Sequence, residues 1–445
     1  MRLSLPLICS QLIYALSGII TTIMIAHLGR DELATNALVW GVYITLVLFF
    51  FGVQNAISAL VAQNHGANNS NGIHTIVTQG IISAFIFTIP MMMVIWFIPN
   101  ILHWTGQDPA TIQLAVPYCH ALALGILPLN LLIVIEQFLV GISVTRPVLF
   151  LSVLKVPLEI FFIYIFLFGK LGVPQLGLAG IGYGITLSTS IIAIVIGCYA
   201  HFSKECRQYR IFSDFCKIDG RYFYKLIRIG LPLGGMYCIE LALFAVAAFM
   251  MGHFGNDLLA AHQIAYQYLV FVLTIIFGIS QGTTVRVGYE VGCNNKAALK
   301  LATYVNMGIG FCFMSFVAIL YIWFPNNIIM LLGMDIHTLK NHILVKHVVT
   351  FLSLAAVLQL IDCFRLICIG ALRGLNDTKM SMYISIVAFW LIAFPSIYLL
   401  AFVLHFGGVG IWLGLIIGTF VSAIILLVRF KYLVKSINLR MLVAK

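Results

Sequence analysis

Long apolar runs alternate along the chain with short polar connections. About 20 apolar residues span a bilayer as a helix, and the sequence contains twelve runs of at least that length. They cover approximately residues 3–28, 36–63, 73–99, 110–140, 147–168, 177–202, 227–252, 259–287, 298–324, 341–371, 380–404 and 409–433. The runs are continuous and do not alternate with polar positions, unlike the strands of a membrane barrel. The pattern predicts an all-α, polytopic membrane protein with twelve transmembrane helices.

The first half of the chain recurs 226 positions later, without a gap, over more than sixty positions. Leu5-Pro6-Leu7 returns as Leu231-Pro232-Leu233, and Gly66, Asn68 and Asn69 return as Gly292, Asn294 and Asn295. Such fixed-offset similarity marks a duplicated structural unit, and repeat halves in membranes build transporters. We therefore expect two six-helix lobes with the same membrane orientation, residues 1–202 and 227–445, joined by a cytoplasmic linker at 203–226. Residues 5–28 have an internal copy, so we expect them to be a helix and not a cleaved leader.

Composition excludes a soluble globule. The chain is 62% hydrophobic and 9% charged, with a mean hydropathy of +1.07, whereas soluble domains carry about 25% charged residues. The net charge of +11 is explained by its placement. If both termini are cytoplasmic, only Arg30, Lys170, Lys340 and Lys346 fall in the external loops, and Lys155 and Arg365 fall within helices. This positive-inside bias accounts for the charge without a nucleic-acid partner.

Cysteine and histidine give no sign of a metal site or a cofactor. The ten cysteines lie mostly inside apolar runs, with no Cys-x-x-Cys pair, and are typical of small core residues. The twelve histidines are dispersed, and only His337, His342 and His347 cluster. We expect no resident metal and no cofactor.

Ionisable residues inside a membrane helix are costly and are candidates for a functional site. The acids that lie well inside apolar runs are Glu136, Glu159, Glu240 and Asp362. Glu240 and Asp362 belong to different helices of the same half. A carboxyl group in low dielectric can hold a proton, and a nearby cation can displace that proton, so such a pair can exchange one cation for another. The alternative is structural: Asp362 neutralises Arg365 at i+3, and Glu240 hydrogen-bonds across helices.

The other two acids are weaker candidates. Glu159 follows Lys155 by four residues, a spacing that favours a structural ion pair on one helix face. Glu136 has no evident partner in the sequence and stays a secondary candidate. Phe, Tyr and Met side chains could line an apolar pocket that binds flat cations through cation–π contacts.

Five ordered motifs carry a resemblance to a known family. They are residues 18–26 (Gly-Ile-Ile-Thr-Thr-Ile-Met-Ile-Ala), 141–147 (Gly-Ile-Ser-Val-Thr-Arg-Pro), 260–263 (Ala-Ala-His-Gln), 285–288 (Val-Arg-Val-Gly) and 370–374 (Gly-Ala-Leu-Arg-Gly). Together they resemble the multidrug and toxic compound extrusion (MATE) transporters, most closely the bacterial NorM branch. The resemblance implies a central cavity between two lobes, efflux of amphipathic organic cations against Na⁺ or H⁺ influx, a bacterial inner-membrane location among lipid, and a functional monomer.

The resemblance also implies roles for particular residues. Glu240 and Asp362 fall where NorM-like proteins carry acids implicated in cation binding. The family's first helix commonly carries an acid where this chain has Thr21, which speaks against a proton relay in the first lobe and favours Na⁺. Leu358 replaces a tyrosine that such proteins can carry one turn before the second acid. In the internal repeat Glu240 corresponds to Tyr14, so we expect the acid chemistry to be concentrated in the second lobe. Tyr14, Thr21, Glu136 and Arg365 are secondary cavity candidates.

Two other functions are open to a chain of this kind. A flippase for lipid-linked oligosaccharide or peptidoglycan precursors shares the two-lobe architecture, but it needs a cationic cavity for a pyrophosphate. The intramembrane charges here are mainly acidic, apart from Lys155 and Arg365. An intramembrane enzyme needs a nucleophile with a base, or metal ligands, at fixed spacing. No such motif is present in the sequence, so we expect a transporter and not an enzyme.

Overall fold

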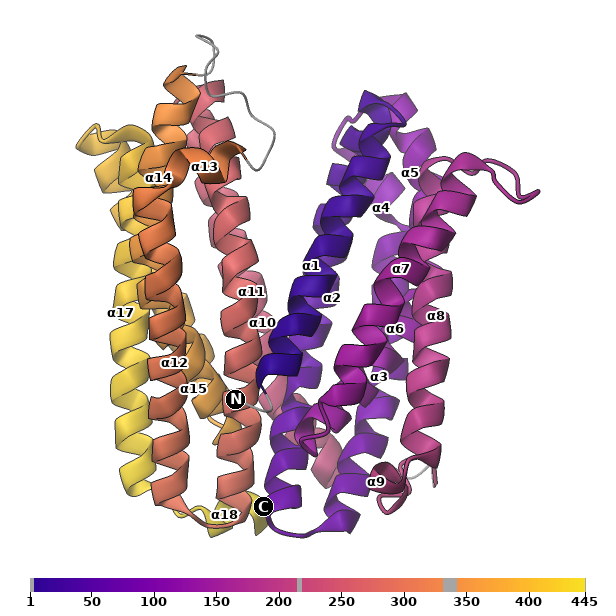
Figure 1. The fold of residues 1–445 in the computed structure, drawn as a ribbon, viewed down its shortest axis with the longest axis vertical. Coiled ribbons are helices and arrows are strands. Elements are labelled where there is room, and N and C mark those ends of the chain that lie inside the picture. Colours follow the sequence, from indigo (N-terminus) through magenta and orange to yellow (C-terminus); the bar gives the residue numbers. More distant parts are fainter. Residues whose placement is uncertain (1–3, 214–217, 331–341, 445) are drawn as a thin grey trace. The chain divides into compact units, whose positions relative to one another are not determined.

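The computed structural model describes residues 4–213, 218–330 and 342–444. In these ranges the chain is helical without strands, and twelve helical spans are long and apolar enough to cross a membrane (Figure 1). The predicted fold class is confirmed. Lys340, which the sequence placed in an external loop, and His337 of the histidine cluster lie outside the described residues.

The described chain divides into two compact units, residues 1–234 (unit 1) and 235–445 (unit 2). The helices of unit 1 are α1 (Ser4–Ala26), α2 (Arg30–Gly66), α3 (Ser70–Trp96), α4 (Ile98–Trp104), α5 (Pro109–Leu124), α6 (Ile126–Gly141), α7 (Arg146–Phe168), α8 (Leu178–Phe202) and α9 (Lys204–Arg207). The boundary falls inside α10 (Gly220–Gly252). α10 begins at Gly220, inside the predicted linker at 203–226, because its first turns are polar and the apolar pattern does not register them.

Unit 2 continues with the second half of α10. Its further helices are α11 (Asn256–Gly292), α12 (Lys296–Trp323), α13 (Pro325–Met330), α14 (His342–Gly374), α15 (Thr378–Ile386), the π-helix η2 (Val387–Ala393), α16 (Phe394–Tyr398), the π-helix η3 (Leu399–Val403), α17 (Gly407–Ser436) and α18 (Arg440–Ala444). The elements from α15 to η3 form one membrane span.

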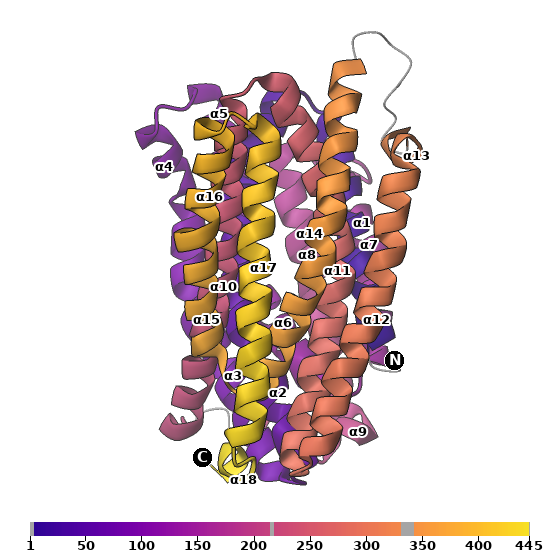
Figure 2. The ribbon, with the colours of Figure 1, turned by 90° about the vertical axis from the view of Figure 1, so that its left-hand side faces the viewer.

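The fourth span is central in each unit. In unit 1 this span consists of α5 and α6, which pack against α2, α3 and α8. In unit 2 it is the single helix α14, which packs against α11, α12 and α17 (Figure 2). Side chains on the inner faces of these spans therefore lie in the interior of their own unit, where a charge must find a partner.

The sequence repeat corresponds to a repeat in structure. α2 and α11 are both 37 residues long and begin and end at the same repeat positions. The turn that follows each helix contains an asparagine with positive φ, 54° at Asn68 and 55° at Asn294. The next asparagine, Asn69 or Asn295, accepts a backbone N–H of the following helix at 3.0 Å. The repeated asparagines are thus explained by turn and capping chemistry.

The structural repeat extends beyond the gapless part of the sequence repeat. A Cβ atom on Gly184 of α8 would lie 2.6 Å from Cγ1 of Ile163, and one on Gly414 of α17 would lie 2.5 Å from Cγ1 of Ile397. Both distances are too short for a real contact, so only glycine at these positions allows the two helices to pack this closely. The last span therefore packs on the preceding one in the same way in each unit, although the loops differ in length.

The segment after α8 is packed on unit 1. The Tyr209 hydroxyl lies 3.2 Å from Nδ1 of His65, at the end of α2. The Tyr209 ring makes an edge contact with Phe138 of α6, with ring centroids 5.8 Å apart. Cys206 of α9 is buried, and burial raises the pKa of its thiol to about 11. Residues 203–213 of the predicted linker are therefore anchored to the first unit through Tyr209; residues 214–217 lie outside the described ranges.

Candidate functional site

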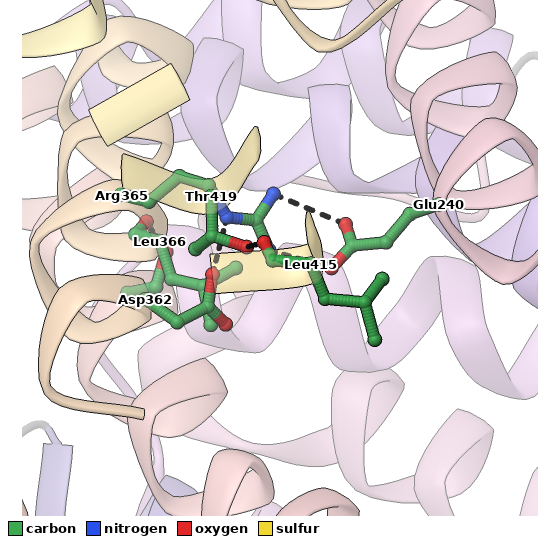
Figure 3. A network of polar contacts seen from close by, with 7 residues as sticks. Glu240, Asp362, Arg365, Leu366, Leu415 and Thr419 are labelled. Atoms are coloured by element: carbon green, nitrogen blue, oxygen red, sulfur yellow. Dashed lines mark hydrogen bonds and ion pairs between the residues drawn. The ribbon is translucent and has the colours of Figure 1, made fainter. Parts of the chain in front are cut away.

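Three ionisable side chains meet inside unit 2 (Figure 3). The Arg365 guanidinium donates from Nη2 to Oε1 of Glu240 at 2.5 Å and from Nη1 to Oε2 at 3.2 Å. Its Nε donates to Oδ1 of Asp362. Arg365 and Asp362 lie on α14 at i,i+3, whereas Glu240 comes from α10. The two carboxylates that the sequence singled out therefore contact one and the same cation.

Two members of this cluster, Asp362 and Arg365, are buried, and Glu240 is partly buried. The exposed fraction of the side chain is 1% for Arg365, 3% for Asp362 and 17% for Glu240. With all three groups ionised, two carboxylates and one guanidinium leave a net charge of −1. Removing a charged group from water is costly unless it is paired and hydrogen-bonded, and the forked guanidinium can satisfy two carboxylates at once. The predicted i,i+3 neutralisation is present, but the same arginine also bridges to the second helix.

An aromatic ring completes the surroundings of Arg365. The guanidinium carbon lies 5.1 Å from the ring centroid of Phe389, within cation–π distance. Phe389 is buried and belongs to η2, and π-helical turns are frequent at functional sites. Sequence reasoning missed this residue, because nothing in its apolar run distinguishes it from its neighbours.

Unit 1 contains a second polar cluster. The Tyr14 hydroxyl of α1 donates to Oε1 of Glu136 at 3.1 Å. The Ser17 hydroxyl donates to Oε1 of Glu159 at 3.0 Å. Lys155 Nζ contacts Oε2 of Glu159 at 2.9 Å and lies 5.2 Å from the Tyr14 ring centroid. The predicted Lys155–Glu159 ion pair is confirmed, and Glu136 has the partner that the sequence did not show.

The unit 1 cluster borders a cavity of about 390 Å³. All five of its side chains line this cavity, and so does Thr21. Unit 1 thus holds two carboxylates and one ammonium of its own beside the cavity, and the concentration of acid chemistry in the second lobe stays a prediction. The sequence carried a signal for Ser17 that was missed. Tyr14, Ser17 and Thr21 follow one another at i, i+3 and i+7, a polar stripe on one face of an apolar helix.

The internal repeat relates the two clusters. Tyr14 and Glu240 occupy the same repeat position on the first helix of their halves. Tyr14 contacts Glu136 of α6, and Glu240 contacts Arg365 of α14. In both units a polar contact thus joins the first span to the central fourth span. The two halves keep this link but build it from different chemistry, a phenol with a carboxylate and a carboxylate with a guanidinium.

In the described ranges, no group of three or more His, Cys, Asp or Glu side chains is placed to hold a metal ion. The proposed histidine cluster falls partly outside those ranges, since they do not include His337. The polar chemistry that the structure describes inside the spans includes ion pairs, hydrogen bonds and cation–π contacts.

Comparison with known proteins identifies similar chains. The MatE family model matches residues 6–165 and 232–399, once in each half. The chain is 32% identical to a probable multidrug resistance protein NorM of Mesorhizobium japonicum, over 97% of this chain and 92% of that protein. It is 31% identical to a protein of the same description from Pseudomonas aeruginosa, over 97% of this chain and 88% of that protein.

Solved structures show the same fold. A MATE protein crystallised in complex with MaL6 superposes with a TM-score of 0.88 at 21% identity, covering 99% of this chain and 96% of the other. The eukaryotic MATE transporter AtDTX14 superposes with a TM-score of 0.84 at 23% identity, covering 100% of this chain and 96% of the other. At these identities the likeness concerns the fold.

Proposed function

The chain belongs to the MATE family and is a polytopic membrane transporter of the multidrug efflux type; from that premise we propose that it exports singly charged organic cations in exchange for Na⁺. The observation that carries the proposal is that Glu240 and Asp362 both contact the guanidinium of Arg365. Two carboxylates that can satisfy one guanidinium are also suited to bind a transported cation.

The preference for Na⁺ over H⁺ rests on Thr21. In NorM-like relatives this position of the first helix commonly carries an acid, and a hydroxyl cannot replace a carboxyl as a proton carrier near neutral pH. Carboxylate and hydroxyl oxygens remain suitable ligands for a hard cation. Exchange of one Na⁺ for one monovalent drug moves no net charge. A second ion would add the membrane potential, about 2.3 kcal/mol per charge per 100 mV.

Purified protein reconstituted into vesicles tests the coupling ion. An inward Na⁺ gradient at equal pH should drive export of a cationic dye, and a pH gradient without Na⁺ should not. Clamping the potential with K⁺ and valinomycin should leave the Na⁺-driven rate unchanged if the exchange is electroneutral. Transport driven by the pH gradient alone, and indifferent to Na⁺, would replace this proposal by proton coupling.

We place the protein in the bacterial inner membrane with both termini cytoplasmic. The exposed basic residues Lys204, Arg207 and Arg210 around α9 support this orientation, because cytoplasmic connections carry the excess of Lys and Arg. A fluorescent protein fused after residue 445 should fluoresce, and an alkaline phosphatase fused there should be inactive. The opposite pair of results would invert the topology.

Two further expectations fit the structure. Both charged clusters form within one chain, so we propose that a monomer is the functional species. The flippase alternative loses support, because the described cluster in each unit carries two carboxylates and one basic group. A net negative charge disfavours a pyrophosphate ligand.

A further inference from the structure

The site proposed for a transported cation already holds a cation of the protein itself. Arg365 reaches both carboxylates and lies over the Phe389 ring. Carboxylate oxygens and an aromatic face are the groups that recognise a flat organic cation. In the structure, Arg365 thus occupies the position that a transported cation would take.

The two contacts of Arg365 differ in how readily they can break. Its contact with Asp362 joins residues one turn apart on α14, so that helix keeps the two side chains within reach of each other (Figure 3). Its contact with Glu240 joins α14 to α10, residues that are 125 positions apart. The guanidinium carries five N–H donors, and Nε can stay on Asp362 while the Nη groups leave Glu240. When a cation binds, only the contact between Arg365 and Glu240 has to break.

Resting on the function proposed above, we propose that Arg365 is a tethered counter-ion: it fills the cation site of unit 2 when no transported cation is bound, and an incoming cation displaces it from Glu240. Asp362 keeps the displaced arginine neutralised and acts as a positioning residue, whereas Glu240 is the ligand of the transported cation. The exchange never leaves a buried carboxylate without a positive partner, which would be costly. Because Asp362 and Arg365 cancel, Glu240 accepts one positive charge. The site is therefore matched to monovalent organic cations.

Direct binding to the purified protein tests this role. The probe is ethidium, a flat monovalent cation, and its dissociation constant is measured by fluorescence anisotropy in Na⁺-free buffer. Arg365→Gln removes the tethered competitor and should bind ethidium at least about tenfold more tightly than the unmodified protein, since one buried positive charge less is present.

Arg286→Gln is the matched control. Arg286 also pairs with an acid, Glu290, and lies over a tyrosine ring, but its side chain is 51% exposed on α11. Its loss should leave ethidium binding unchanged.

A second variant covers the case in which Arg365→Gln does not fold. Arg365→Lys keeps the positive charge, but an ammonium lacks the planar fork that satisfies both carboxylates. It should hold Glu240 less firmly and bind ethidium more tightly than the unmodified protein, by less than the glutamine variant. If folded Arg365→Gln or Arg365→Lys protein binds ethidium no more tightly than the unmodified protein while Glu240→Gln loses binding, Arg365 only pins two helices together and the tethered-ion role is wrong. If Glu240→Gln binds ethidium as tightly as the unmodified protein, the proposed cation site itself fails.

Discussion

Glu240→Gln and Asp362→Asn are each expected to abolish cation-coupled efflux. Both substitutions keep the size of the side chain and remove its negative charge. In the Gln variant the transported cation loses its proposed ligand. In the Asn variant the Arg365 guanidinium has only Glu240 to neutralise it, so it cannot be displaced. Each variant keeps one carboxylate against Arg365, and we therefore expect both to fold and to insert normally.

The measurement is export of a cationic dye from reconstituted vesicles under an inward Na⁺ gradient. The rate for either variant should fall to that of empty vesicles. Glu205→Gln and Asp257→Asn make the same chemical changes at exposed positions on α9 and α11 and should export normally. Normal rates and normal expression of both site variants would show that the coupling site lies elsewhere.

Most of the fold could be predicted from the sequence because a bilayer admits few solutions. A spanning segment must satisfy its own backbone, so each long apolar run has to be a helix. The errors lie at the polar ends. α2 begins at Arg30, before the apolar run starts, and its first turn contains Asp31 and Glu32. Acidic residues stabilise a helix N-terminus, and hydropathy alone does not register them.

The candidate site was predictable only as far as local helix geometry reaches. Asp362–Arg365 and Lys155–Glu159 follow from i,i+3 and i,i+4 spacing on a single helix. Tyr14–Glu136 joins residues 122 positions apart, and no spacing rule indicates it. Such pairs depend on which helices pack together and on their rotation about their axes. The repeat offered partial help, because it aligned Tyr14 with Glu240 and so pointed to one polar position on the first helix of each half.

The polar cluster of unit 1 leads to the second large effect, on stability. Lys155→Met keeps an unbranched side chain but removes the ammonium, so the cation–π contact with the Tyr14 ring is lost and Glu159 is left without a positive partner. Only the Ser17 hydroxyl then remains as a described partner of that carboxylate. The side chains of Lys155 and Glu159 are 14% and 9% exposed, and breaking a buried pair from one side costs about 3–5 kcal/mol of unfolding free energy.

A companion variant separates charge from packing. Lys155→Met combined with Glu159→Gln removes both charges and should recover most of the lost stability, because a neutral amide can keep the hydrogen bond to Ser17 without a buried charge. Unfolding by SDS in mixed micelles measures both variants, with Lys300→Met, an exposed lysine of α12, as a control that should change the free energy of unfolding by less than about 0.5 kcal/mol. Equal destabilisation of the single and the double variant would mean that Lys155 acts through packing. In that case the charges of unit 1 would not stabilise its fold, and their burial around the cavity would need a functional reason.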